Sequence, residues 1–134
     1  MTELSIAMQN YLETIFVLSR KGDGARVSDI ASELSVSKAS VNSAMNILAK
    51  LGYVSNEKYQ EIYLTEQGRE MASFLESKHR ILKTLFTEVL DIPEKVADDD
   101  ACAIEHIISR EAVQRIHNYL IEHGIEEKKA HQNF

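Results

Sequence analysis

The stretch VSDIASELSVSKASVNSAMNILAKLG, residues 27–52, decides the fold of this chain. Ser28 is expected to cap a short helix, and Ser35-Val36-Ser37 is typical of a tight turn. Ser37 should then cap a second helix that ends at Gly52. One face of the second helix is apolar at helical spacing, through Val41, Ala44, Met45, Leu48 and Leu51. The order helix, short turn, helix is the helix-turn-helix layout.

The surrounding segments extend this layout on both sides. Apolar residues at helical spacing predict a first helix from about residue 4 to about residue 20. Two short strands are expected at 53–57 and 61–64, which would form a wing around Lys58. Thr65 should cap a long helix, for which a break or a dimer contact is plausible. Two further helices are expected. The first starts near Pro93 and continues through Ile104, Ile107 and Ile108, and the second is capped by Ser109.

Composition narrows the class of protein. The 134 residues are 44% hydrophobic and 27% charged, which is typical of a globular chain. The single cysteine excludes an internal disulfide framework. The chain start does not resemble a signal peptide and no apolar run is long enough to cross a membrane, so a cytoplasmic protein without membrane partner is expected. No phosphate loop, nucleophile elbow or His-Glu-x-x-His pattern is present, and we therefore expect no enzyme and no organic small-molecule substrate.

The net charge of −6 is distributed unevenly. Residues 20–62 carry six basic and five acidic side chains, whereas residues 85–127 carry three basic and eleven acidic ones. The N-terminal half could therefore face phosphates, while the C-terminal half suits cations.

The second helix of the motif would enter the major groove of DNA. Its outward positions carry small hydroxyl and amide side chains, which can bond phosphates and base edges. A winged helix can also serve as a protein-interaction module, and this alternative stays open at this point. The candidate DNA-binding residues are Arg26, Ser37, Lys38, Ala39, Ser40, Asn42, Ser43, Asn46, Lys50 and Lys58.

A second constellation is Cys102, Glu105 and His106, whose spacing of i, i+3 and i+4 places them on one face of a helix. A thiolate, a carboxylate and an imidazole can each bind a divalent cation. Further candidate ligands are His79 on the long helix and Asn10 and Glu13 on the first helix. The alternatives are a buried apolar cysteine and solvated surface residues.

The neighbouring run Asp98-Asp99-Asp100 is expected to be solvated. The mixture of candidate ligands is unlike a structural zinc site, which favours several Cys and His. It suits Fe²⁺ or Mn²⁺, with Zn²⁺, Co²⁺ or Ni²⁺ also possible in vitro.

Five motifs in this order resemble the diphtheria-toxin-repressor family, which includes iron-dependent repressors and the manganese transport regulator. They are Tyr11-Leu12-Glu13-Thr14-Ile15-Phe16, Val27-Ser28-Asp29-Ile30-Ala31, Leu64-Thr65-Glu66-Gln67-Gly68, Lys78-His79-Arg80 and Ala101-Cys102-Ala103-Ile104-Glu105-His106. The resemblance implies a homodimeric, metal-activated repressor that binds palindromic operators upstream of metal-uptake genes. It implies a mainly α fold with a winged helix-turn-helix domain at 1–68, a helical metal-binding and dimerisation domain at 69–124 and a polar tail at 125–134.

The resemblance also assigns roles by position. The residues Cys102, Glu105 and His106 match the family's main metal ligands, and Asn10 falls where the family has Met or Asp. His79 matches a second-site ligand, and Glu13 matches one used in the manganese branch. The chain departs from the iron branch at Lys83 and Asp98, where that branch places the Glu and His of its second site. By length, the chain resembles the short manganese type.

The hypothesis for its mechanism is that the metal ties the first helix to the C-terminal helices. This would fix the spacing of two recognition helices at about 34 Å in the dimer. The apolar side chains expected at the dimer surface are those of Leu85, Val89, Ile92, Ile104, Ile107 and Ile108, with a plain core as the alternative.

Overall fold

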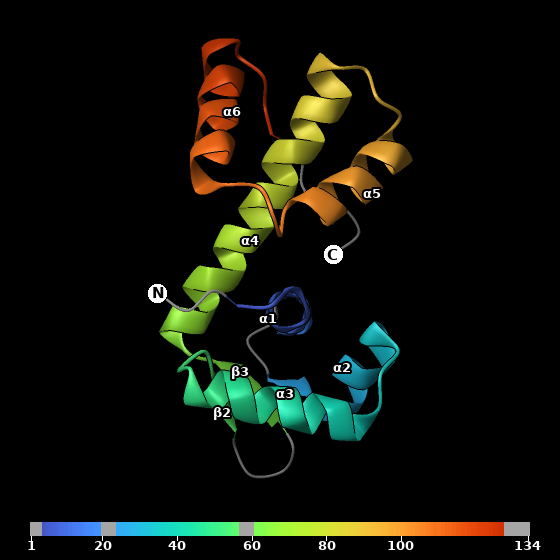
Figure 1. The fold of residues 1–134 in the computed structure, drawn as a ribbon, viewed down its shortest axis with the longest axis vertical. Helices are drawn as coiled ribbons and strands as arrows, with labels where there is room; N and C mark the ends of the chain where they lie inside the picture. The colour runs from blue at the N-terminus through green and yellow to red at the C-terminus, as the bar shows by residue number, and fades with distance from the viewer. Residues whose placement is uncertain (1–3, 20–23, 57–60, 128–134) are drawn as a thin grey trace. The chain divides into compact units, whose positions relative to one another are not determined.

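The computed structural model describes residues 4–19, 24–56 and 61–127, and the chain divides into two compact units at Phe74 and Leu75. Each unit has its own architecture (Figure 1). The elements of the first unit are α1 (Ile6–Leu18), β1 (Ala25–Arg26), α2 (Val27–Leu34), α3 (Lys38–Lys50), β2 (Val54–Asn56), β3 (Glu61–Leu64) and the first part of α4 (Glu66–Thr84). The predicted mainly α fold with a winged helix-turn-helix is confirmed.

The turn between α2 and α3 follows from its serines. Ser35 adopts a left-handed conformation with φ of 55°, which ends α2 and redirects the chain. Ser37 then caps α3, because its Oγ accepts a hydrogen bond from the backbone N of Ser40 at 3.0 Å. The predicted cap at Ser28 is wrong, since the chain passes directly from β1 into α2 and Arg26 stands at the N-cap without a side-chain bond.

A three-stranded antiparallel sheet with the order β1-β3-β2 forms the wing. Val54 pairs with Leu64 in the expected hairpin, and Ala25 pairs with Ile62 on the other edge of β3. The strand β1 was not predicted, because two residues carry no readable alternation. The DNA-binding prediction at Lys58 lies outside the described residues.

One apolar core holds the first unit together. Completely buried side chains from α1, α2, α3 and β3 meet there, and they include Leu12, Ile15, Ile30, Met45 and Ile62. The predicted inward face of α3 is confirmed at Val41, Ala44, Met45 and Leu48, whereas Leu51 is 39% exposed. Leu51 differs because it is the C-cap residue, where the chain turns away from the helix axis toward Gly52.

Thr65 joins the wing to α4 through two hydrogen bonds. Its Oγ1 donates to the carbonyl O of Gly52 at 2.6 Å and accepts from the backbone N of Gly68 at 3.0 Å. We expect Thr65→Val to lower the free energy of unfolding by about 1–2 kcal/mol, because one helix-capping bond and one loop bond are lost together. Urea unfolding followed by circular dichroism measures the change.

The matched control is Thr87→Val. The Thr87 hydroxyl donates to the carbonyl O of Lys83 one helical turn earlier, at 3.0 Å, and caps nothing. Its removal should change the free energy of unfolding by less than about 0.5 kcal/mol. Equal effects of the two substitutions would contradict the capping role of Thr65.

The second unit contains the rest of α4, a π-helical turn at Leu85–Val89, α5 (Glu94–Ile104) and α6 (Arg110–Glu122). The break expected in the long helix is confirmed by the π-helical turn. Ile81, Val113 and Leu120 form its buried apolar cluster. Ser109 caps α6 as predicted, accepting from the backbone N of Ala112 at 3.1 Å. Among the helices of the described residues, none is both long and apolar enough to cross a membrane.

Candidate metal centre

Glu105 lies at the end of α5 and is buried, which is unusual for a carboxylate. The helix ends at Ile104, and Glu105 is its C-cap residue. The prediction that the helix continues to Ile108 is therefore wrong. The backbone N of Glu105 still bonds Ala101 O at 2.9 Å, but Ile107 N bonds Ile104 O at 2.9 Å, which tightens the chain into a turn before α6. This turn directs the Glu105 side chain inward, where it is 1% exposed.

The turn after α5 is also anchored from α4. The buried Lys78 side chain extends from α4, and its Nζ donates to the carbonyl O of Ile108 at 3.2 Å. This hydrogen bond therefore ties the turn that carries Glu105 and His106 to α4 at Ile108.

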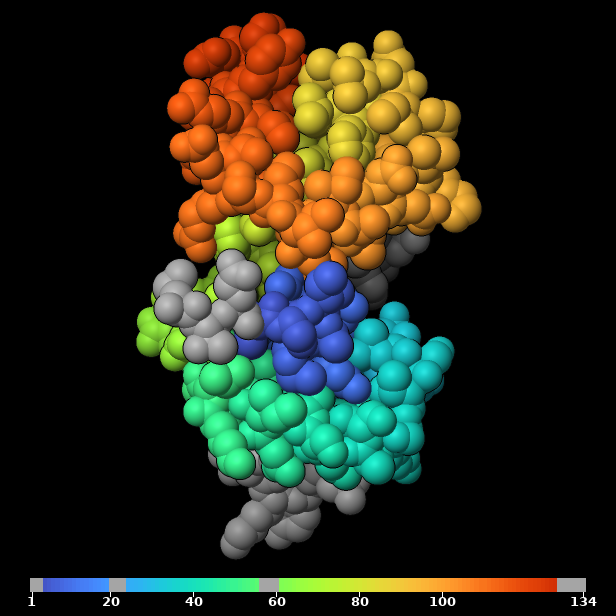
Figure 2. Space-filling model, viewed as in Figure 1, coloured from blue at the N-terminus to red at the C-terminus, as the bar shows by residue number. Residues whose placement is uncertain are grey.

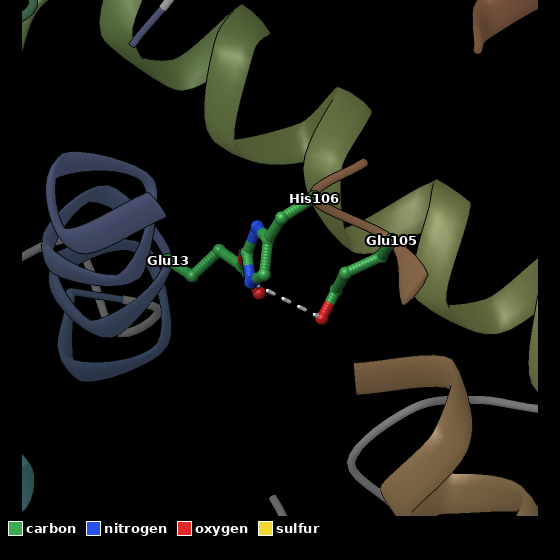
Figure 3. A group of neighbouring side chains, drawn as sticks. All are labelled: Glu13, Glu105 and His106. Atoms are coloured by element: carbon green, nitrogen blue, oxygen red, sulfur yellow. Dashed lines mark ion pairs between the residues drawn. The ribbon is translucent and has the colours of Figure 1, made fainter. Parts of the chain in front are cut away.

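Glu105 and His106 present two donor atoms to one another. His106 Nε2 lies 3.9 Å from Glu105 Oε1 (Figure 3). Two ligand atoms at about 2.1 Å from one ion can be at most about 4.2 Å apart, so this separation allows a shared cation. In the part of the chain that the structure describes, Glu105 Oε2 is buried without a hydrogen-bond partner. A buried, incompletely bonded carboxylate is costly alone and is what a cation would satisfy.

The two histidines beside Glu105 are in different electrostatic situations. Burial lowers the pKa of His106, Glu105 opposes this by raising it, and the charges of Lys78 and His79 lower it further. The net lowering keeps the His106 imidazole neutral at neutral pH. A neutral imidazole is the form that binds a metal.

His79 bridges two carboxylates. Its Nε2 lies 2.8 Å from Asp98 Oδ1, and its Nδ1 lies 3.4 Å from Glu105 Oε1. Burial alone would lower the pKa of His79, but hydrogen bonds and charges from Glu105 and Asp98 outweigh burial and raise it. Both ring nitrogens can donate only in the imidazolium form, which agrees with the raised pKa.

The other predicted ligands are spread over α1 and α5. Cys102 is on α5, one turn before Glu105, and its side chain is exposed. Asn10 and Glu13 are on α1 and are partly buried. Glu13 is drawn in Figure 3 with Glu105 and His106, and it comes from the first unit while the other two come from the second. The second unit therefore brings together Glu105, His106 and His79.

Two charged residues beside His79 were not predicted to belong to the site. Asp98 had been expected in a solvated run, yet Lys83 and His79 contact its carboxylate, and together they lower its pKa although burial opposes them. Lys83 is buried at 5% exposure. Two signals were available. The resemblance placed Lys83 and Asp98 at the second-site positions of the iron branch, and His79 and Lys83 are four residues apart on α4, as are Glu94 and Asp98 on α5.

The residues predicted to bind DNA that the structure describes lie on β1 and on and just before α3, and they are exposed. Arg26 on β1 and the polar positions of α3 are exposed, and α3 is part of the surface in Figure 2. The exposed candidates on and before α3 are Ser37, Lys38, Ala39, Ser40, Asn42, Ser43, Asn46 and Lys50. The opposite face of α3 is buried, so the helix is oriented with its polar side outward.

Two family models together match most of the chain. Residues 3–62 match the iron-dependent repressor N-terminal DNA-binding domain, and residues 65–123 match the iron-dependent repressor metal-binding and dimerisation domain. The chain belongs to this family of transcriptional repressors, which is the diphtheria-toxin-repressor family expected from its motifs. It is therefore a metal-dependent DNA-binding regulator rather than an enzyme.

Individual relatives span most of the chain. An uncharacterized HTH-type transcriptional regulator of Methanocaldococcus jannaschii is 32% identical over 84% of this chain and 91% of its own length. The crystal structure of a hypothetical protein from Sulfolobus solfataricus has a TM-score of 0.74 and 25% identity, covering 93% of this chain and 99% of that one. The manganese regulator SloR has a TM-score of 0.73 and 27% identity, covering 90% of this chain and 55% of SloR.

Proposed function

We propose that this protein is a homodimeric repressor that binds a palindromic operator when it holds Fe²⁺ or Mn²⁺, and that it controls genes of metal homeostasis. The observation that carries the proposal is the buried carboxylate of Glu105, with one oxygen toward His106 and the other without a hydrogen-bond partner in the described structure. The manganese regulator among the similar structures supports Mn²⁺, and the description of the family supports Fe²⁺.

Glu105 and His106 form the centre of the proposed ligand set. The bound cation would satisfy the Glu105 oxygen that has no hydrogen-bond partner in the described structure. Cys102, one turn earlier on α5, can join after a rotation of its exposed side chain. A thiolate favours Fe²⁺, whereas oxygen donors favour Mn²⁺. Whether the Cys102 thiolate coordinates the ion therefore decides which of the two metals is preferred.

Asn10 and Glu13 of α1 are proposed to complete the set. They are three residues apart and therefore share a face of α1. The helix α1 packs on α2, α3 and β3 within the first unit, so any restraint on α1 is passed to the recognition helix. Metal binding then favours one arrangement of the recognition helices by its differential affinity for that arrangement.

The second unit has exposed apolar side chains that are candidates for contacts in the proposed homodimer. Leu90, Val96 and Ile107 are 55%, 48% and 74% exposed. Of the apolar residues expected at the dimer surface, Ile107 is the most exposed, and the others are partly buried.

The proposal predicts that metal raises affinity for operator DNA. Gel-shift titration of the palindrome upstream of a metal-uptake gene, under anaerobic conditions, should give at least about 10-fold tighter binding with Fe²⁺ or Mn²⁺ than with chelator. A coupling of this size corresponds to about 1.4 kcal/mol, which is within the usual range for allosteric regulators. Light scattering on the same samples should give the mass of a dimer.

Two results would contradict the proposal. Equal affinity with metal and with chelator would show a metal-independent winged-helix regulator. Absence of DNA binding at low salt would show that the winged helix contacts protein instead. Magnesium at the same concentration is the control, because Mg²⁺ prefers six oxygen ligands and keeps several waters.

A further inference from the structure

Five charged side chains form an alternating ladder between α4 and α5 in the second unit. Lys83 Nζ lies 3.4 Å from Glu94 Oε1 and 3.5 Å from Asp98 Oδ1. The same Asp98 oxygen lies 2.8 Å from His79 Nε2, and His79 Nδ1 lies 3.4 Å from Glu105 Oε1. The order along the ladder is therefore Glu94, Lys83, Asp98, His79 and Glu105.

Lys83 is the most buried cation of this ladder. Its side chain is 6% exposed, whereas those of Glu94 and Asp98 are 58% and 44% exposed. Burying an ammonium is costly unless carboxylates compensate, and here two carboxylates from one face of α5 do so. The imidazole of His79 and the carboxylates of Glu94 and Asp98 are also donors that suit a divalent cation. An ammonium thus stands among donors typical of a metal site.

We propose that Lys83 is a resident cation that replaces a second metal ion in this unit, so that each protomer takes one transition-metal ion. The proposal rests on the proposed function, because that single ion is the one held by Glu105 and His106. The Lys83 ammonium pairs with both Glu94 and Asp98 and occupies the place between them. Asp98 in turn holds His79, and His79 holds Glu105, whose carboxylate keeps one oxygen without a hydrogen-bond partner in the described structure.

His79 accordingly acts as a positioning residue. Both of its ring nitrogens face carboxylates that are themselves fixed, one by Lys83 and one by the turn after α5. Partners of this kind orient a metal ligand without binding the metal, and their loss typically costs about 10–100-fold in metal affinity.

The test counts metal ions per protomer. Anaerobic equilibrium dialysis against Mn²⁺ followed by elemental analysis should give one ion for the wild-type chain. Lys83→Glu removes the ammonium and adds a carboxylate beside Glu94, Asp98 and His79, so it should bind two ions. Lys83→Met removes the ammonium without adding a donor and should still bind one. The matched control is Lys95→Glu, because Lys95 pairs with Asp99 at 3.3 Å while being 88% exposed.

A second readout does not depend on metal. In metal-free protein, Lys83→Met should lower the melting temperature by about 2–4 °C, because Glu94 and Asp98 lose an ion-pair partner and repel one another one helical turn apart on α5. Lys95→Met should leave the melting temperature within about 1 °C, because exposed ion pairs contribute little. Circular dichroism checks that each variant is folded at the dialysis temperature.

The outcomes separate the two proposals. Wild-type protein that binds no ion overturns the proposed function. Two ions in the wild-type chain, or one ion in a folded Lys83→Glu variant, overturn the resident cation while the proposed function stands. If Lys83→Glu does not fold, the melting temperature of Lys83→Met decides, and an unchanged value overturns the resident cation.

Discussion

Replacing Glu105 by glutamine is expected to weaken metal binding by at least about 100-fold. Losing a residue that only hydrogen-bonds to a metal ligand costs about 10–100-fold in metal affinity, and losing the ligand itself should cost at least the upper value. The substitution keeps the size of the side chain and removes its charge. The buried site would then offer a neutral amide to the cation beside His106. Metal-dependent DNA binding should be lost as a consequence, while binding measured with chelator should stay at the wild-type level.

Isothermal titration with Mn²⁺ measures the affinity, and gel-shift titration measures the DNA response. The matched control is Glu111→Gln, because Glu111 is an exposed carboxylate in the first turn of α6. A Glu105→Gln variant that keeps wild-type metal affinity would sink the proposed metal centre. A variant that binds metal weakly but still shows the full metal-dependent increase in DNA affinity would instead show that the metal at Glu105 does not control DNA binding.

Gly68→Ala is expected to lower the free energy of unfolding by about 3–5 kcal/mol, at the upper end of single substitutions. In an open helix this change would stabilise by about 1 kcal/mol, because alanine is the better helix former. Here a Cβ on Gly68 would lie 1.9 Å from the carbonyl O of Tyr53. That carbonyl is fixed by a hydrogen bond from the backbone N of Thr65 at 3.0 Å, so the backbone cannot move aside cheaply.

The control for Gly68 is Gly124→Ala. A Cβ on Gly124 would meet nothing within 4 Å, but its φ of 66° is left-handed. The expected cost is therefore only the conformational one, about 1–2 kcal/mol. Urea unfolding gives both values. A smaller effect at Gly68 than at Gly124 would contradict the close approach of α4 to Tyr53.

Features set by neighbouring residues were predictable from the sequence. The caps at Ser37, Thr65 and Ser109 depend on a hydroxyl and a backbone NH three residues away, and all three are confirmed. The end of α3 at Gly52 follows in the same way from its φ of 87°. The family was likewise predictable, because its motifs are short and ordered.

Features set by distant parts of the chain were not predictable. The strand β1 exists only because β3 pairs with it on one edge. Asp98 was expected in solvent because the residues of α5 alone do not reveal that Lys83 and His79 face it from α4, and only the resemblance to the iron branch pointed to these positions. The burial of Glu105 depends on where α5 ends, and that end is fixed by the tight turn at Ile107. The metal ligand set itself remains a prediction, with Glu105 and His106 adjacent within the second unit and His79 beside Glu105.

Lys83 has a consequence for how the protein would respond to changing metal supply. The Lys83 ammonium is covalently part of the chain. Its ion pairs with Glu94 and Asp98 therefore do not depend on how much metal the cell contains. Occupancy of a single remaining site rises with free metal as a simple hyperbola. In the proposed dimer with one ion per protomer, any steepness beyond that in the regulation of a promoter would come from coupling between the two protomers or from DNA, and not from two ions on one protomer.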